Sequence, residues 1–157
     1  MQISIRVKRT ENKAAKDMMW KKIDRGLDDL ADFILERSQQ MVPVNESMLK
    51  KSGYTDKKYL MKHIGYGKEV DGKEIGYAMA VEFGSRPHYL PVKAINEDLT
   101  RWAHLVLGLN QKEANAAAWA ISKKIAAVGT EAQPYLRPAV DEAKIKAAAI
   151  IKNAMRK

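Results

Sequence analysis

The chain has 157 residues, with 28 Lys and Arg against 19 Asp and Glu, so its formal net charge is +9 at pH 7. This length predicts one domain, because domains typically contain about 100–200 residues. The absence of cysteine excludes disulfides, thiolate catalysis and cysteine-ligated zinc or iron–sulfur sites. The hydrophobic fraction of 46% is that of a globular protein and argues against disorder throughout. No window approaches the about 18 apolar residues of a membrane span, and the alternating first residues are unlike a signal peptide.

The excess positive charge is concentrated at the two ends of the chain. Residues 1–16 hold five positive side chains and one negative, and residues 141–157 hold five positive and two negative. A basic balance can indicate nucleic acid or an anionic membrane as a partner. Because the long middle of the chain has a net charge of only +2, the charge is interpreted as a property of the termini and not of a DNA-reading domain.

The first predicted elements are a strand and a long helix. Gln2–Lys8 alternates polar and apolar residues, as a half-buried strand does. Apolar residues then recur at spacings of three and four over Met18–Met41, which predicts a helix that ends before Pro43. This apolar stripe either packs against the sheet as core or offers its methionines as an adaptable groove for a partner helix.

The middle of the chain is predicted to form a loop and a hairpin. Residues 42–58 lack a clear period and are interpreted as a loop. Tyr59–Tyr66 has strand character, and Asp71-Gly72 is a hairpin-type turn dipeptide. Glu74–Phe83 alternates and is predicted to be the second strand of this hairpin.

The rest of the chain is predicted to be helical. Gly108 suits the C-cap of a first helix, and Asn110 suits the N-cap of the next, with Glu113 completing a capping box. Pro134 and Pro138 suit the first turn of the last helix, where a missing backbone donor costs little. The three predicted helices cover Asn96–Leu107, Gln111–Val128 and a last segment that ends at Met155.

No sequence motif predicts catalysis. The chain lacks a phosphate loop, a GxGxxG segment after a strand and a GxSxG nucleophile elbow. The three histidines, His63, His88 and His104, lack the spacing of metal ligands. His88 could approach Glu82 across a turn, but a histidine on a surface turn is the favoured interpretation. We therefore expect no catalytic residue, no metal, no cofactor and no enzymatic activity.

A lysine-rich segment offers an alternative function. Two lysine pairs alternate with tyrosines, and such a patch can contact phosphates while aromatic rings stack on bases. With the basic termini, this segment would make a small nucleic-acid-binding module; otherwise it is a solvated loop. The lysines concerned are Lys50, Lys51, Lys57 and Lys58.

Three short motifs follow one another in a fixed order. Met41–Ser52 reads MVPVNESMLKKS, Tyr77–Ser85 reads YAMAVEFGS and Gln133–Ala139 reads QPYLRPA. They resemble the elements aPvdtGrLrxSi, YAxxvEfGT and qPFlRPAl of the tail-completion, or head–tail joining, proteins of long-tailed bacteriophages. The resemblance spans about residues 15–155. This chain differs from the family pattern in having Ser-Met instead of Thr-Gly in the first motif, and a helical insertion at about residues 87–128.

The resemblance implies an α+β fold: a small, mostly antiparallel sheet packed against a long N-terminal helix, with the helical insertion and a C-terminal helix. It also implies a non-enzymatic virion protein, made in the host cytoplasm, that completes the tail and joins it to the head. Its partners would be copies of itself in a ring, sixfold in the assembled virion, together with neck or adaptor proteins and tail-tube or tail-terminator proteins. DNA would be passing cargo, with no cofactor and no membrane.

Within this resemblance we predict a surface that contacts other subunits or neck and tail proteins. A glycine at position 84 would let the chain turn sharply. Arg137 could pair with Glu82, either within one subunit, where the pair would brace the insertion, or between subunits. Trp102 and Trp119 either pack into the core or anchor an interface. The predicted interface residues are Glu82, Phe83, Gly84, Arg86, Trp102, Trp119, Arg137 and Pro138.

Overall fold

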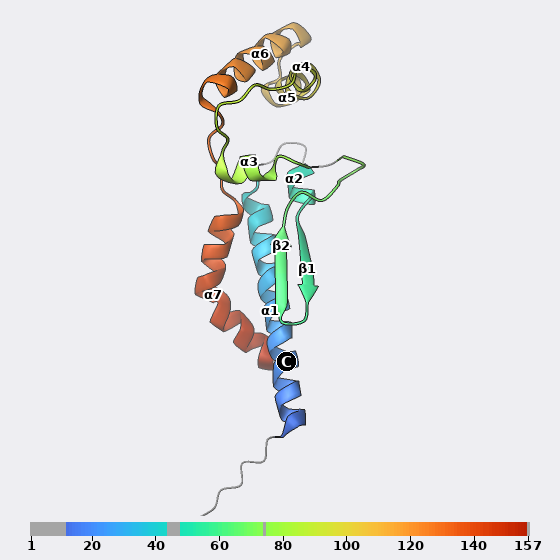
Figure 1. The fold of residues 1–157 in the computed structure, drawn as a ribbon, viewed down its shortest axis with the longest axis vertical. Helices are drawn as coiled ribbons and strands as arrows, with labels where there is room; N and C mark the ends of the chain where they lie inside the picture. Colours follow the sequence, from blue (N-terminus) through green and yellow to red (C-terminus); the bar gives the residue numbers. More distant parts are fainter. Residues whose placement is uncertain (1–11, 44–47, 74, 157) are drawn as a thin grey trace, which may run out of the picture.

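A computed structural model describes residues 12–43, 48–73 and 75–156 of the chain, which form an elongated molecule (Figure 1). Its body contains two long helices and a β-hairpin, and a smaller helical tip sits at one end of the body. The predicted strand Gln2–Lys8 lies outside the described residues. The fold is α+β, with a two-stranded antiparallel sheet beside a long N-terminal helix.

The body is built on helices α1, Lys13–Met41, and α7, Leu136–Arg156, which run antiparallel to each other (Figure 1). Small residues allow the two helices to approach closely, because Ala139 and Ala143 are buried against Ile34. Helix α7 begins after Pro134, and Pro138 occupies its first turn. The prediction of Pro138 in that turn is confirmed, whereas Pro134 precedes the helix.

Helix α1 is the predicted amphipathic helix, and it begins five residues earlier than its apolar stripe. The side chain of Asn12 accepts a hydrogen bond from the N–H of Ala15 at 3.2 Å and so caps the helix. Ile34, in the second half of the stripe, belongs to the core, whereas Met18 is 62% exposed. The core interpretation therefore holds for the part of the stripe that includes Ile34, whereas Met18 and Met19 at its start are exposed.

The sheet consists of β1, Tyr54–Lys58, and β2, Met61–Gly65, paired antiparallel. Helix α1 lies between this hairpin and α7 (Figure 1). The hairpin turn is fixed to α1, because the Leu60 N–H donates a 2.6 Å hydrogen bond to Asp24. Lys62 of β2 lies 2.8 Å from carboxylate oxygens of both Asp24 and Asp28, with little of its side chain exposed.

Two sequence predictions about the middle of the chain are wrong. The expected loop at residues 42–58 contains helix α2, Met48–Lys51, and strand β1, so β2 pairs with the segment before it. The expected strand Glu74–Phe83 is helix α3, Ala78–Phe83. Asp71-Gly72 does form a tight turn, and among the residues that the structure describes the bridge around it is the single pair Val70 and Lys73.

The physical reason for the second error lies in the pattern of the segment itself. Ala78 and Glu82 are four residues apart and both are buried, which is a helical period as well as an even strand spacing. Val81 also packs against the core, and residues 78, 81 and 82 share one face in a helix but not in a strand. Tertiary packing thus decides between two periods that the sequence leaves open.

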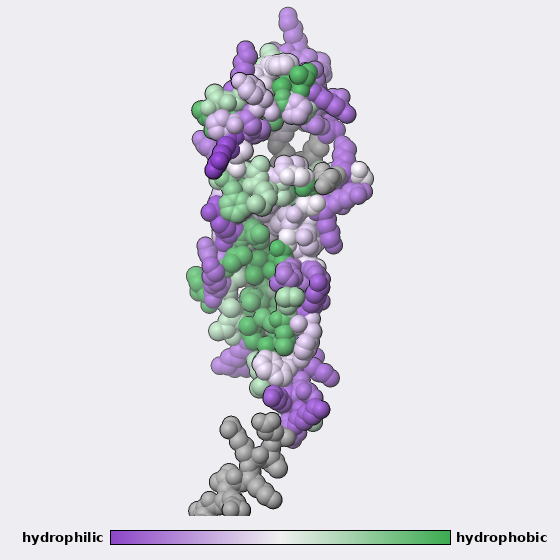
Figure 2. All heavy atoms as spheres, viewed as in Figure 1, coloured by the Kyte–Doolittle hydropathy of each residue, from purple (hydrophilic) through white to green (hydrophobic). Residues whose placement is uncertain are grey.

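A hydrophobic core lies beneath α2 and α3, at the end of the body nearest the tip. Its buried members come from four separate segments and pack around the ring of Tyr135. They are Val42, Leu49, Ile75, Ala78 and Tyr135. The strongly hydrophobic side chains visible in Figure 2 are likewise concentrated along the body.

The tip contains the predicted helical insertion. Gly108 has the left-handed conformation of a C-cap, and Asn110 and Glu113 form the predicted capping box. A π-helical turn precedes the first long helix, and Thr100 donates from its hydroxyl to the Ile95 carbonyl there at 2.9 Å. The elements are α4 Val92–Ala94, the π-helix η1 Ile95–Leu99, α5 Thr100–Leu107 and α6 Gln111–Val128.

Candidate functional site

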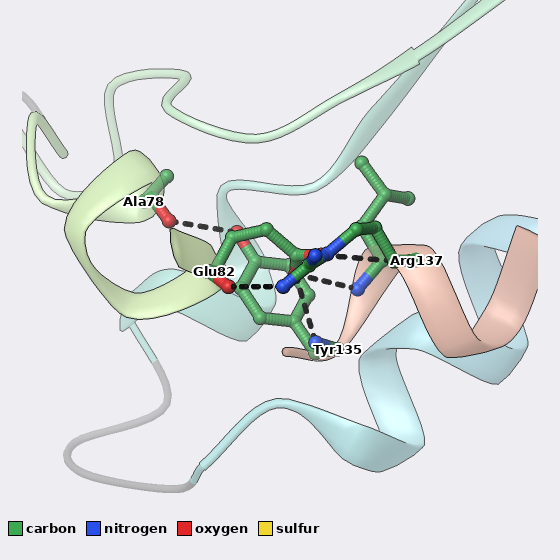
Figure 3. Close-up of polar contacts among 5 residues, drawn as sticks. Ala78, Glu82, Tyr135 and Arg137 are labelled. Atoms are coloured by element: carbon green, nitrogen blue, oxygen red, sulfur yellow. Dashed lines mark hydrogen bonds and ion pairs between the residues drawn. The ribbon is translucent and has the colours of Figure 1, made fainter. Parts of the chain in front are cut away.

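Glu82 of α3 caps the N-terminus of α7 with its carboxylate (Figure 3). Its Oε2 accepts hydrogen bonds from the backbone N–H groups of Tyr135 at 2.8 Å and Leu136 at 2.9 Å. Its Oε1 accepts from the Arg137 N–H at 3.0 Å. The first N–H groups of a helix have no partner within the helix, so a side chain from a distant segment supplies the cap here.

This arrangement holds Glu82 in its ionised form. Only 4% of the residue is exposed, and burial alone would raise the pKa of its carboxyl. The backbone N–H groups of Leu136, Tyr135 and Arg137, together with the Arg137 side chain, outweigh burial and hold the pKa of Glu82 below its ordinary value. The positive end of the α7 dipole acts in the same direction.

Arg137 completes the pair with Glu82 inside the same chain. Its Nε lies 3.1 Å from Glu82 Oε1, and its Nη2 donates to the Glu82 main-chain carbonyl at 3.3 Å (Figure 3). The guanidinium also lies 5.0 Å from the centre of the Phe83 ring, in cation–π geometry. The Arg137 side chain is nevertheless 57% exposed, so its outer edge remains accessible to a second molecule.

Tyr135 connects this cap to the core. Its hydroxyl donates to the Ala78 carbonyl at 3.4 Å, and its ring meets Tyr66 edge-on with the centroids 4.8 Å apart. The Tyr66 hydroxyl lies 2.7 Å from the Ser38 hydroxyl on α1. Burial raises the pKa of Tyr135 to about 12. The cap is thus tied through two aromatic rings to the C-terminal end of α1.

A short neck joins the body to the tip beside this cap. Ser85 and Thr130 form an antiparallel bridge, with N–H···O distances of 3.0 and 3.2 Å, and their hydroxyls lie 2.9 Å apart. Gly84 and Gly129 flank the bridge with φ of 74° and 77°. A Cβ at either glycine would collide with backbone atoms of the opposite segment, so both positions need glycine for conformation and for space.

The outer face of α3 is apolar and accessible. Met79 and Phe83 are four residues apart, on one face of the helix, and they are 68% and 55% exposed. Tyr77 adds a further exposed ring just before the helix. Because Glu82 is occupied by hydrogen bonds within the chain, the accessible part of this site consists of apolar side chains and the outer edge of the Arg137 guanidinium.

The structure brings only some of the predicted interface residues together. Five surround the cap at the start of α7, and Arg86 is exposed next to the neck. Trp102 on α5 is half-buried, and Trp119 on α6 lines an open groove of about 260 Å³ in the tip. The five residues around the cap are Glu82, Phe83, Gly84, Arg137 and Pro138.

The histidines do not form a site. His88 is exposed and its Nδ1 lies 2.8 Å from the Arg86 carbonyl, so the interpretation as a turn histidine is confirmed. In the part of the chain that the structure describes, no three His, Asp or Glu side chains are grouped to hold a metal ion. None of the helices in that part is both long and apolar enough to cross a bilayer.

Nearby carboxylates neutralise much of the positive charge of the lysine-rich segment. Lys57 lies 2.7 Å from an oxygen of Asp32 on α1, and Lys58 lies 3.6 Å from Asp56. Lys51 lies 4.0 Å from Asp71, whereas Lys50 is exposed near the end of α2. The interpretation of this segment as a nucleic-acid patch gains no support from its geometry.

Sequence reasoning missed Tyr135 and the pair Ser85 and Thr130. Tyr135 stands between the two prolines of a motif, so its sequence position gives no periodic pattern from which burial could be predicted. The bridge joins residues 45 positions apart. A glycine on each side, Gly84 and Gly129, is the only signal in the sequence for a close approach there.

Comparisons with known proteins identify no relative: the sequence matches no family model, and neither a curated protein nor a solved structure matches it significantly.

Proposed function

We propose that this chain is a non-enzymatic structural protein of a bacteriophage or prophage that completes the tail and joins it to the head by assembling into a ring. One observation carries the proposal. Residues of all three motifs that resemble the tail-completion family meet in the core around Tyr135: Val42 and Leu49 from the first, Ala78 from the second and Tyr135 from the third. Motifs dispersed over nearly the whole sequence thus contribute to one hydrophobic core.

The exposed surface of α3, next to this core, supports an assembly role. A ring closes through heterologous contacts, in which one face of a subunit meets a different face of its neighbour. The exposed Met79 and Phe83 on α3, next to the exposed edge of Arg137, provide one such face. Aromatic residues, methionine and arginine are the residue types enriched at protein interfaces. The capping bonds from Glu82 hold this face rigid, which lowers the entropy lost on binding.

The partners follow from the same proposal. Copies of the chain would form a ring, sixfold in the virion, whose two sides contact neck or adaptor proteins and tail-tube or tail-terminator proteins. The tip, which carries Trp119 with a partly exposed ring, would contact one of these partners. No step of this function needs a cofactor or a reacting group.

The test combines imaging with a matched pair of variants. The full chain is studied by sedimentation velocity and negative-stain electron microscopy, alone and mixed with the neck and tail-tube proteins encoded beside it. We expect rings for the natural chain and for Ile145→Ser, which removes an exposed apolar side chain from α7. The double variant Met79→Ser, Phe83→Ser should keep its circular dichroism spectrum and lose the rings.

Arg137→Glu is a poorer test, because it would place a second carboxylate next to the buried Glu82 and disturb the fold itself. A natural chain that stays monomeric with every neck and tail component would contradict the proposed function. Equal ring formation by the double variant would show instead that α3 is not the contact face.

A further inference from the structure

The antiparallel arrangement of α1 and α7 places the two basic ends of the sequence at one end of the molecule. Gly26 of α1 packs directly on Ile151 of α7, and the Lys22 ammonium donates to the Met155 carbonyl at 2.8 Å. The segments Lys13–Arg25 and Lys152–Arg156 are therefore neighbours at the end of the body opposite the tip (Figure 1). We call these two segments the basic pole.

The basic pole carries a large net positive charge, and ion pairs among the described residues do not neutralise it. It contains seven positive side chains and two negative ones, Asp17 and Asp24, and Asp24 is already paired with Lys62. Among the residues that the structure describes, no carboxylate forms an ion pair with any of the seven cations, and six of them are exposed. They are Lys13, Lys16, Lys21, Lys22, Arg25, Lys152 and Arg156.

Other described parts of the molecule carry less unpaired positive charge. Residues 48–73 hold seven positive and three negative side chains, but four of the lysines, Lys51, Lys57, Lys58 and Lys62, lie within 4.0 Å of carboxylates. The tip and its neck, residues 86–131, hold six positive and four negative side chains. Helix α1 projects beyond α7 at the basic pole, and hydrophilic side chains dominate that projecting end (Figure 2). In the sequence, three further positive side chains and one negative precede Asn12, and Lys157 follows Arg156.

The distribution of side chains around α1 distinguishes between the possible partners. An interfacial membrane helix needs an apolar face opposite a charged one. Met18, Met19 and Trp20 are exposed but consecutive, so they point in directions about 100° apart. Lys16, Lys21 and Lys22 lie on the same turns of the helix, and the apolar stripe of α1 turns toward α7, where Gly26 meets Ile151. The exposed apolar residues of these turns therefore do not form one face that could enter a bilayer, whereas cations distributed around a helix suit a polyanion.

We propose that the basic pole binds the phosphate backbone of DNA without reading its sequence. The exposed cations can each approach a phosphate and displace a counterion, which is the main source of such affinity. Trp20, partly exposed beside Lys21, can rest on a sugar or base edge. This inference goes beyond ring assembly, and it is tested on the isolated chain, so its outcome is independent of the ring.

The experiment measures binding of the full chain to a fluorescent duplex of about 20 base pairs by anisotropy. The natural chain should lose about 1,000-fold in affinity between about 50 and 200 mM salt, the loss expected for six phosphate contacts. The pole variant changes Lys13, Lys16, Lys21 and Arg25 to Gln. We expect it to bind at least about 10-fold more weakly, with a salt slope smaller by about three to four.

Two control variants have the same net charge as the pole variant. The tip control changes Lys93, Lys112, Lys123 and Lys124 to Gln, and the hairpin control changes the four lysines at positions 50, 51, 57 and 58 to Gln. All of these lysines are exposed. Both controls should bind within about three-fold of the natural chain, because they weaken only the screened long-range field.

Three results would overturn the proposal. Equal losses in all three variants would assign the binding to net charge and not to the pole. A loss confined to the hairpin control would move the site to the lysine-rich segment. Binding to vesicles containing phosphatidylglycerol, without binding to the duplex at low salt, would make the partner a membrane surface. Circular dichroism of each variant excludes unfolding as the cause.

Discussion

Glu82 illustrates how one buried side chain can join segments that are distant in sequence. The four hydrogen bonds to its carboxylate all come from residues 135–137, more than 50 positions away, and three of the four donors are backbone N–H groups at the start of α7 or directly before it. A helix N-terminus concentrates partial positive charge and unpaired donors. A carboxylate is therefore a better cap here than a neutral side chain of the same size.

Replacing Glu82 with Gln tests this cap. The amide keeps the size of the side chain but loses the negative charge and turns one oxygen into a donor, so we expect the free energy of unfolding at pH 7 to fall by about 2 kcal/mol. The depressed pKa of Glu82 means that the unfolded state binds the proton more readily. The contribution is therefore fully present above the unfolded pKa of about 4.3 and is lost as the pH falls through the folded value.

Urea unfolding across pH 3–7 measures both effects. The gap between the natural chain and Glu82→Gln should be widest near pH 7 and should narrow below about pH 4.5. Glu69→Gln, which changes an exposed carboxylate, should leave the stability curve nearly unchanged. A gap that stays constant down to pH 3 would mean that the ionised carboxylate contributes nothing and that only the shape of the side chain matters.

At the scale of secondary structure, long periodic segments could be predicted from the sequence and short ones could not. Helix α1 follows from its apolar spacing, and the start of α6 follows from the capping box of Asn110 and Glu113. Helix α3 is short, and the burial of Ala78 and Glu82 in it suits a strand or a helix equally well. The contacts that Ala78, Val81 and Glu82 make together around Tyr135 decide for a helix, and those contacts are not local in the sequence.

The partner of strand β2 could not be predicted for a similar reason. The turn dipeptide at Asp71-Gly72 is genuine, but it closes only a single bridge. The sheet instead uses the turn at Tyr59-Leu60, where Leu60 has φ of 55° and a bond to Asp24 on α1. A non-glycine residue in the left-handed region is uncommon, so the sequence carries no local signal for this turn, and the helix surface supplies the stabilising contact.

Alanine, rather than a large apolar residue, sets the distance between α1 and α7. Ala139 is completely buried against Ile34 on the opposite helix. We expect Ala139→Leu to lower the free energy of unfolding by about 1–3 kcal/mol, because extra methylenes in a packed core force neighbouring side chains and backbone to move. Ala148→Leu, an exposed position on the same helix, provides the control and should change stability little.

Thermal and urea unfolding of the two variants give the comparison. Both substitutions replace one strong helix former with another, so propensity does not confound the result. Equal stability of the two variants would mean that α1 and α7 can separate freely and that the close contact is unimportant. Sequence alone could place alanines on α7, but their role as spacers depends on the antiparallel partner.

For the whole molecule, the decisive feature is the separation of body and tip. The two hydrophobic clusters contain residues of the body only, and the tip joins the body through the bridge between Ser85 and Thr130. The concentrated positive charge also lies away from the tip, because the basic pole is at the opposite end of the body (Figure 1). The sequence indicates basic termini, but only the antiparallel pairing of α1 and α7 brings them together.

If the tip is an appendage, the body should fold without it. Ser85 and Thr130 exchange both N–H···O bonds, and such a pair is the natural end point of a two-residue hairpin. We expect a chain in which Asn-Gly replaces residues 86–129 to keep the helicity of α1 and α7 and to unfold cooperatively. Ala-Ala at the same place should be less stable by about 1–2 kcal/mol or more, because both residues must adopt left-handed conformations. Circular dichroism and urea unfolding of the two shortened chains measure this difference.

A shortened chain that fails to fold with either turn would mean that the tip contributes to the stability of the body. If instead the body folds and still binds DNA through the basic pole, while ring assembly with neck and tail proteins is lost, the tip would be assigned to those partners.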